Sequence, residues 1–237
     1  MRIVSVMAIV IMACTSSVAQ QKWFTLYHDS VALVNDANAI SNRFINDVKR
    51  MKKDLTFGPE VIVNTQPNLV FYADNTVNLP LWEEVDPGIK GFFSTIAGSE
   101  ADGEKIFGLM FNGFYLIHEL GHALQDAIDP AELTGSYEHE YSANVIAMLY
   151  WKKVGRSEQL QECYEEVKKA SARLRDPVPA GTEKEQYFTE QYYQAAQDPF
   201  VYAYMQFYQF IEIYEDPAMP DFDTFLKEYL KNVSRHE

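Results

Sequence analysis

The segment from about residue 104 to residue 128 constrains the fold of this 237-residue chain more than any other. Its apolar residues, among them Ile106, Phe111 and Leu124, fall on most sides of a helix rather than along one stripe. A helix that is apolar nearly all round must be buried, because none of its faces suits contact with water. The sequence therefore predicts one buried helix, ended by Asp129-Pro130, around which the rest of a domain packs.

The remaining pattern predicts a predominantly helical α+β fold with a small antiparallel sheet before the buried helix. Apolar spacing and breaker residues predict helices at 30–55, 136–153, 157–174, 184–197, 199–214 and 221–233, and strands at 61–64, 69–73 and 76–79. Asp74-Asn75 reads as the turn of a hairpin between the last two strands. Residues 81–102, which are interrupted by proline and glycine, are expected to form an irregular connection.

The buried helix contains the motif His118-Glu119-Leu120-Gly121-His122. The two histidines are four residues apart, so both imidazoles emerge on one face and can bind one metal ion. Glu119 lies about 100° further around the helix, where it can reach a water beside the ion rather than the ion itself. Burying two histidines and a glutamate without a partner is costly, which favours a metal site over an accidental pattern.

A zinc site with an open position needs a third protein ligand. Asp126 and Asp129 follow the motif closely but are poorly placed, because a ligand on the same helix must reach past His122. Glu140, on the next predicted helix, is the better candidate, with Asn144 on the same face one turn later. We expect Glu140 to bind the metal and Asn144 to hold a ligand histidine by a hydrogen bond.

The motif followed 18 residues later by Glu140-x-x-Ala-Asn resembles the gluzincin metallopeptidases, in particular the compact pattern of ImmA/IrrE-like peptidases. The resemblance covers about residues 69–153 and implies a zincin-like fold. It implies zinc on His118, His122 and Glu140, catalysis by Glu119 and support by Asn144. Two features depart from that pattern. Those peptidases are typically intracellular, and this chain lacks their usual aromatic residue after the Ala-Asn pair.

The resemblance also implies an edge strand that holds the substrate backbone above the site. The residues expected to form this strand are Thr76, Val77, Asn78 and Leu79. Candidate donors to the developing oxyanion flank the third ligand; they are Tyr137, His139 and Tyr141. A tyrosine or histidine of the C-terminal helices could also serve, and the sequence does not select one of them. The aromatic-rich segment between Tyr187 and Tyr214 is expected to pack as core and to form the other wall of the cleft.

These residues predict a zinc metallopeptidase in which Glu119 is the general base for attack by water on a peptide bond. An alternative is a catalytically inactive binding or sensing module with a structural zinc. That alternative requires a fourth ligand, for which Glu138 and His139 are candidates. A third, weaker interpretation is a protein without metal in which the motif is accidental.

The charge balance argues against anionic partners. The chain carries 34 acidic and 20 basic residues, a net charge of −14, which repels nucleic-acid backbones and anionic lipid. We therefore expect a peptide or protein substrate and no nucleic-acid partner. Beyond the N-terminus no apolar stretch of about 20 residues occurs, so no transmembrane segment is expected in the mature chain.

The N-terminal residues are typical of an export signal, with one basic residue, a short apolar run and Ser17-Val18-Ala19 as a cleavage pattern. We expect residues 1–19 to be a signal peptide and the protein to be periplasmic, extracellular or on the outer surface. A looser match keeps open a lipoprotein signal ending before Cys14, with a lipid anchor there. Residues 20–237 are then one zincin-like catalytic domain. Residues 20–155 hold the N-terminal helix, the sheet and the zinc-site helices, and 156–237 form a helical C-terminal subdomain.

Overall fold

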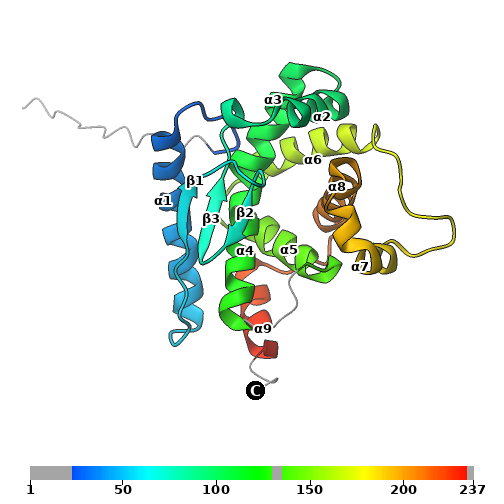
Figure 1. The fold of residues 1–237 in the computed structure, drawn as a ribbon. Helices are drawn as coiled ribbons and strands as arrows, with labels where there is room; N and C mark the ends of the chain where they lie inside the picture. The colour runs from blue at the N-terminus through cyan, green and yellow to red at the C-terminus, as the bar shows by residue number, and fades with distance from the viewer. Residues whose placement is uncertain (1–22, 130–134, 234–237) are drawn as a thin grey trace, which may run out of the picture.

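The computed structural model describes residues 23–129 and 135–233, and their fold is α+β and mostly helical (Figure 1). The expected signal peptide and Cys14 lie outside the described residues. Within the described ranges, no helix combines the length and the apolar character needed to cross a membrane.

The sheet has three strands, β1 (Glu60–Val63), β2 (Phe71–Ala73) and β3 (Thr76–Leu79), in the order β1-β3-β2. The hairpin expected around Asp74-Asn75 is confirmed: β2 and β3 pair antiparallel, and both turn residues have positive φ. The expectation of a wholly antiparallel sheet is wrong, because β1 pairs parallel to β3. Residues 64–70 carry the chain to the opposite edge of the sheet, so the second strand of the hairpin, not the first, meets β1.

This order corrects the expected substrate edge. Thr76–Leu79 form the central strand and are paired on both sides, so they cannot offer a free backbone edge. The edge strand next to α4 is β2. α1 (Ser30–Met51) packs against β1, and α4 packs against β2 and β3 (Figure 1).

The stretch expected to be irregular, 81–102, is largely helical. It contains the short 3₁₀ turn η1 (Trp82–Glu84), α2 (Pro87–Ala97) and the start of α3 (Glu100–Leu109). Pro87 is the first residue of α2, Gly98 ends that helix in the left-handed conformation, and Ser99 caps α3. These residues are boundaries of helices rather than of loops, because proline suits a first helical turn and glycine suits a helix C-terminus.

The buried helix is confirmed, with an interruption that the sequence did not predict. α3, a π-helical turn η2 (Met110–Phe114) and α4 (Tyr115–Ile128) follow one another directly. Phe107, Leu116 and Leu124 along this path are fully buried. A π turn takes up an extra residue and so changes which face the following residues present. Here it lies directly before the turn of α4 that carries His118.

The C-terminal half is helical, as expected. Its helices are α5 (Tyr137–Lys153), α6 (Ser157–Ser171), α7 (Lys184–Ala195), α8 (Pro199–Glu215) and α9 (Phe222–Val233). α6, α8 and α9 contribute Leu160, Phe210 and Leu226 to the same core as the sheet and α4. A second, smaller apolar cluster joins Tyr137 of α5 to Phe188 of α7 and Met205 of α8.

Candidate metal centre

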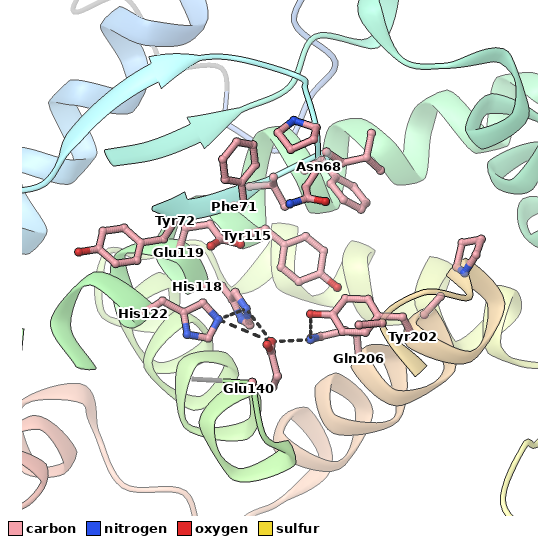
Figure 2. Close-up of a pocket in the computed structure, with 18 of the residues that line it drawn as sticks. Asn68, Phe71, Tyr72, Tyr115, His118, Glu119, His122, Glu140, Tyr202 and Gln206 are labelled. Atoms are coloured by element: carbon pink, nitrogen blue, oxygen red, sulfur yellow. Dashed lines mark hydrogen bonds and ion pairs between the residues drawn. The ribbon is translucent and has the colours of Figure 1, made fainter. Parts of the chain in front are cut away.

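α4 carries two histidines one turn apart, and both rings point toward α5 (Figure 2). His118 is buried and His122 is partly buried. Gly121, between them along the chain, lets α5 approach closely, since a Cβ there would lie 3.2 Å from the Ala143 Cα. The small residues Gly121 and Ala143 thus allow a close contact between α4 and α5, which places α5 against the histidines.

α5 brings the third side chain to the same point. Glu140 lies in its first turn and is buried, with Oε2 3.2 Å from His118 Nε2 and 3.6 Å from His122 Nε2. The two Nε2 atoms are 3.0 Å apart. Ligand atoms around a tetrahedral zinc ion with bonds of about 2.0 Å are separated by about 3.3 Å. These three atoms therefore have the spacing that one such ion requires.

Two amide side chains orient the imidazoles. Asn144 Oδ1 lies 2.8 Å from His118 Nδ1, and Gln125 Oε1 lies 2.7 Å from His122 Nδ1. Gln125 donates its NH₂ group to the His139 carbonyl at 2.9 Å, so its oxygen must face His122. Each Nδ1–H therefore donates to an amide oxygen, which leaves the Nε2 lone pairs directed at the shared point. The expected role of Asn144 as the partner of a histidine is present in this contact.

A buried amide network from α8 connects two of the three converging groups. Asn144 Nδ2 donates to Gln206 Oε1 at 2.9 Å and to Gln209 Oε1 at 2.8 Å. Gln206 Nε2 in turn donates to Glu140 Oε2 at 2.7 Å, and Gln209 Nε2 donates to the Tyr137 carbonyl at 3.0 Å. Neither glutamine was predicted from the sequence. The available signal in the sequence was a pair of glutamines three residues apart in a helix rich in aromatic residues. Polar side chains on a buried face need hydrogen-bond partners, so this pair indicated a polar contact in the core.

The Glu140 carboxylate and the His122 imidazole shift each other's pKa. Burial alone would raise the pKa of Glu140, but His122 and His118 outweigh it and hold that pKa well below its usual range. Burial also disfavours the charged form of His122, yet the Glu140 carboxylate raises the pKa of His122 to about 9. A carboxylate enclosed with two imidazoles therefore demands a positive charge here, which either a proton or a metal cation can supply.

Glu119 lies beside the converging atoms and points toward β2 (Figure 2). It is 5% exposed, and burial raises its pKa, while the neighbouring His118 and His122 and a hydrogen bond from the Tyr72 backbone amide oppose the rise. The edge strand thus contacts the expected general base directly.

Three tyrosines that the sequence analysis did not select border the site. Tyr192 of α7 donates its hydroxyl hydrogen to Glu140 Oε1 at 2.7 Å, and the Tyr115 ring lies 5.3 Å from the His118 ring. The Tyr202 hydroxyl accepts from Gln206 Nε2 at 3.1 Å. Burial and the nearby carboxylates raise the pKa of all three, so each stays protonated and able to donate. Tyrosines on later helices could not be brought to the motif by sequence spacing alone.

The other candidates near the motif have different surroundings. Asp126, the alternative third ligand, accepts a hydrogen bond from the Tyr72 hydroxyl at 2.8 Å, and Glu138 is exposed. His139 stacks on His122 with ring centroids 4.6 Å apart. Of the expected oxyanion donors, His139 lines the cleft but Tyr137 and Tyr141 do not. Among the described residues, the converging group that could hold a metal consists of His118, His122 and Glu140.

These groups lie in a cleft of about 970 Å³. The β2 strand and the loop before it form one wall, and α7 and α8 form the opposite wall (Figure 2). The aromatic segment expected to form that second wall contributes Tyr192, Tyr202 and Phe207 to it. The converging side chains are thus accessible to a ligand considerably larger than water.

No family model, no curated protein and no solved structure matches this chain.

Proposed function

We propose that this chain is an exported, zinc-dependent metallopeptidase of the gluzincin type with a zincin-like catalytic domain. The observation that carries the proposal is the convergence of three ligand atoms, 3.0 to 3.6 Å apart, beside a buried glutamate in an open cleft. Two of these atoms are imidazole nitrogens whose lone pairs are oriented by amide partners. This donor set of two histidines and a glutamate suits zinc with one position left for water or substrate.

Bound zinc would supply a Lewis acid that lowers the pKa of a water molecule and polarises a peptide carbonyl. Glu119 is placed to accept a proton from the attacking water and then to deliver it to the amide nitrogen of the leaving group. The Tyr72 amide holds the Glu119 carboxylate in position. Asn144 and Gln125 keep both histidines in the tautomer that binds through Nε2.

The substrate backbone would lie along β2, which borders the cleft. β2 pairs with β3 along one edge, and its other edge pairs with no strand among the described residues. Extended peptides commonly bind by adding a strand to such an edge. Donors for the developing oxyanion are best sought among Tyr115, Tyr192 and Tyr202, whose rings line the cleft, rather than at Tyr137 or Tyr141.

A structural zinc in an inactive sensing module is less well supported. Such a site has four protein ligands. Of the candidates for the fourth, Glu138 is exposed and His139 stacks on a ligand ring instead of directing a nitrogen at the centre. A cleft of this size beside the three groups also favours a substrate over a closed site.

Metal analysis combined with cleavage profiling tests the proposal. The purified protein should contain about one zinc per chain and cleave denatured proteins, and a chelator should stop cleavage. The Glu119→Gln variant should retain the metal and lose about 100- to 10,000-fold in turnover, as expected for loss of a general base. Glu138→Gln, which changes an exposed glutamate nearby, is the matched control and should behave like wild type. A Glu119→Gln variant with wild-type turnover, or a protein without bound zinc, would refute the proposal.

A further inference from the structure

The cleft continues beyond the candidate metal ligands into an aromatic recess, which we define as Ile89, Phe92, Phe93, Phe111, Ala203 and Phe207. These residues come from α2, η2 and α8. Tyr115 links the recess to the metal site, because its ring lies 5.3 Å from the His118 ring and 5.1 Å from the Phe111 ring. The recess is therefore one aromatic ring away from the site of chemistry.

The walls of the recess are already packed in place. Phe93 is 1% exposed and meets Phe92 and Phe111 edge-on, with ring centroids 5.3 Å apart in both pairs. Phe207 is also buried, on the opposite helix. A guest side chain would contact a preformed apolar surface, so binding costs little ordering of the protein. Extended backbone advances about 3.3 Å per residue, which places the recess within a few residues of a bond held at the metal site.

The charge of the cleft further limits what can bind. Asp74, Asp86 and Asp126 line it together with Glu119 and Glu140, and no lysine or arginine occurs among the described residues that line it. Away from the candidate metal site, a C-terminal carboxylate would find no lysine or arginine partner among the described lining residues and would be repelled by these acids. Basic side chains beside the scissile bond would instead be attracted.

We infer that the cleft takes an internal polypeptide segment that combines a bulky aromatic or branched aliphatic side chain, seated in the aromatic recess, with basic neighbours. This inference rests on the proposed peptidase function and specifies its substrate class. It makes the protein an endopeptidase for apolar, positively charged segments rather than a carboxypeptidase.

Matched peptides test the inference in two ways, by binding to an inactive variant and by cleavage with the wild-type protein. One set of acetylated and amidated peptides varies a single position among Phe, Leu, Ser and Asp, with either Lys or Glu flanking it, and one member carries a free C-terminal carboxylate beside that position. Binding is measured by calorimetry to zinc-loaded Glu119→Gln, and cleavage is measured with wild type. Burial of a phenyl side chain predicts about 30-fold tighter binding of the Phe peptide than of the Ser peptide. Lys flanks should bind tighter than Glu flanks, and the free carboxylate should weaken binding.

Filling the aromatic recess with a larger side chain should remove the preference for the Phe peptide over the Ser peptide. Ala203, on α8, is only partly buried, and Ala203→Leu narrows the recess from the cleft side. Ile89→Trp does the same from α2 and serves as a second variant should the first fold poorly. Ala172→Leu enlarges an exposed alanine at the end of α6 and is the matched control. Both recess variants should lose the advantage of Phe over Ser while keeping zinc, and the control should retain it.

The outcomes separate this inference from the proposed function. Cleavage that is indifferent to the variable position, or a preference that survives both recess variants, overturns the inference and leaves the peptidase function intact. Selective binding without cleavage by wild type supports the recess and refutes the peptidase. Preference for Glu flanks or for a free carboxylate overturns the inference, and so does the absence of any binding.

Discussion

Replacing Gln206 with leucine tests whether the amide network holds the candidate metal ligands or only fills the core. The change removes the donor 2.7 Å from Glu140 Oε2 and the acceptor 2.9 Å from Asn144 Nδ2, and keeps a side chain of similar size. A hydrogen bond to a buried charge contributes about 1.5 to 3 kcal/mol and a neutral one about 1 kcal/mol. The free energy of unfolding should therefore fall by about 3 kcal/mol, which lowers Tm by about 10 °C for a chain of this size.

Metal affinity separates this change from a general loss of stability. Removing a hydrogen-bond partner of a ligand typically weakens metal binding about 10- to 100-fold, and we expect a loss in that range for Gln206→Leu. Gln209→Leu is the matched control. It is similarly buried and also accepts a hydrogen bond from Asn144, but its NH₂ group donates to the Tyr137 carbonyl instead of to Glu140. It should lower Tm similarly and change zinc affinity only a few-fold, because the remaining amide still orients Asn144.

The assay is competition for zinc against a fluorescent chelator, with Tm measured on the same samples. Equal zinc affinities for Gln206→Leu and wild type would show that Glu140 needs no fixed partner. Equal losses for the two glutamine variants would show that affinity follows stability rather than the contact to the ligand. Either result would refute the reasoning from the network.

Two further changes test the geometry of the site. Glu140→Gln removes the only carboxylate among the converging groups and should weaken zinc binding at least 100-fold, whereas Glu138→Gln should not, as measured by the same competition. Gly121→Val would push side-chain atoms into the Ala143 backbone, 3.2 Å from the position of a Cβ, and should lower the free energy of unfolding by about 2 kcal/mol in urea. Gly91→Val, where a Cβ meets nothing within 4 Å, should be neutral or slightly stabilising, and equal effects of both substitutions would contradict the close packing of α4 on α5.

The parts of the fold that could be predicted from the sequence are those determined by residues close together in the chain. The all-round apolar pattern predicted the buried helix, and Asp74-Asn75 predicted a turn that the structure confirms through two positive φ values. The parallel pairing of β1 with β3 joins residues 16 apart in the chain, Glu60 with Thr76, and no local signal specifies that partner. The expected substrate edge was wrong for the same reason, because which strand lies at an edge depends on non-local pairing.

The residues of the candidate site also fall into those that could be predicted from local sequence and those placed only by tertiary packing. The histidines and Glu119 share one helix, so their common face follows from helical geometry. Glu140 could be predicted because it lies on the next predicted helix with Asn144 one turn later, both visible in the sequence. Gln206 and Tyr192 lie more than 50 residues further along and meet Glu140 only through the packing of α7 and α8 on α5. Their contribution depends on tertiary structure, which spacing cannot supply.

The distribution of buried polar side chains gives the strongest physical reason to regard this cleft as a functional site. Twelve polar or charged side chains are buried among the described residues, and eight of them lie at or around the candidate metal site: His118, Glu119, Gln125, His139, Glu140, Asn144, Gln206 and Gln209. None of their side-chain atoms is among the buried ones without a hydrogen-bond partner.

A core built only for stability would gain from apolar residues at these positions, because buried charged groups rarely stabilise more than a well-packed apolar replacement. The cost of burying so many polar groups is concentrated at one point. There α4 and α5 direct imidazole lone pairs and a carboxylate oxygen at one another, and α7 and α8 donate hydrogen bonds to that carboxylate. Contacts that fix the orientation of each ligand atom have little use in an inert core. A metal centre requires such contacts. Each ligand side chain must be held in position before the cation binds, and a hydrogen bond to a neighbouring group holds it there.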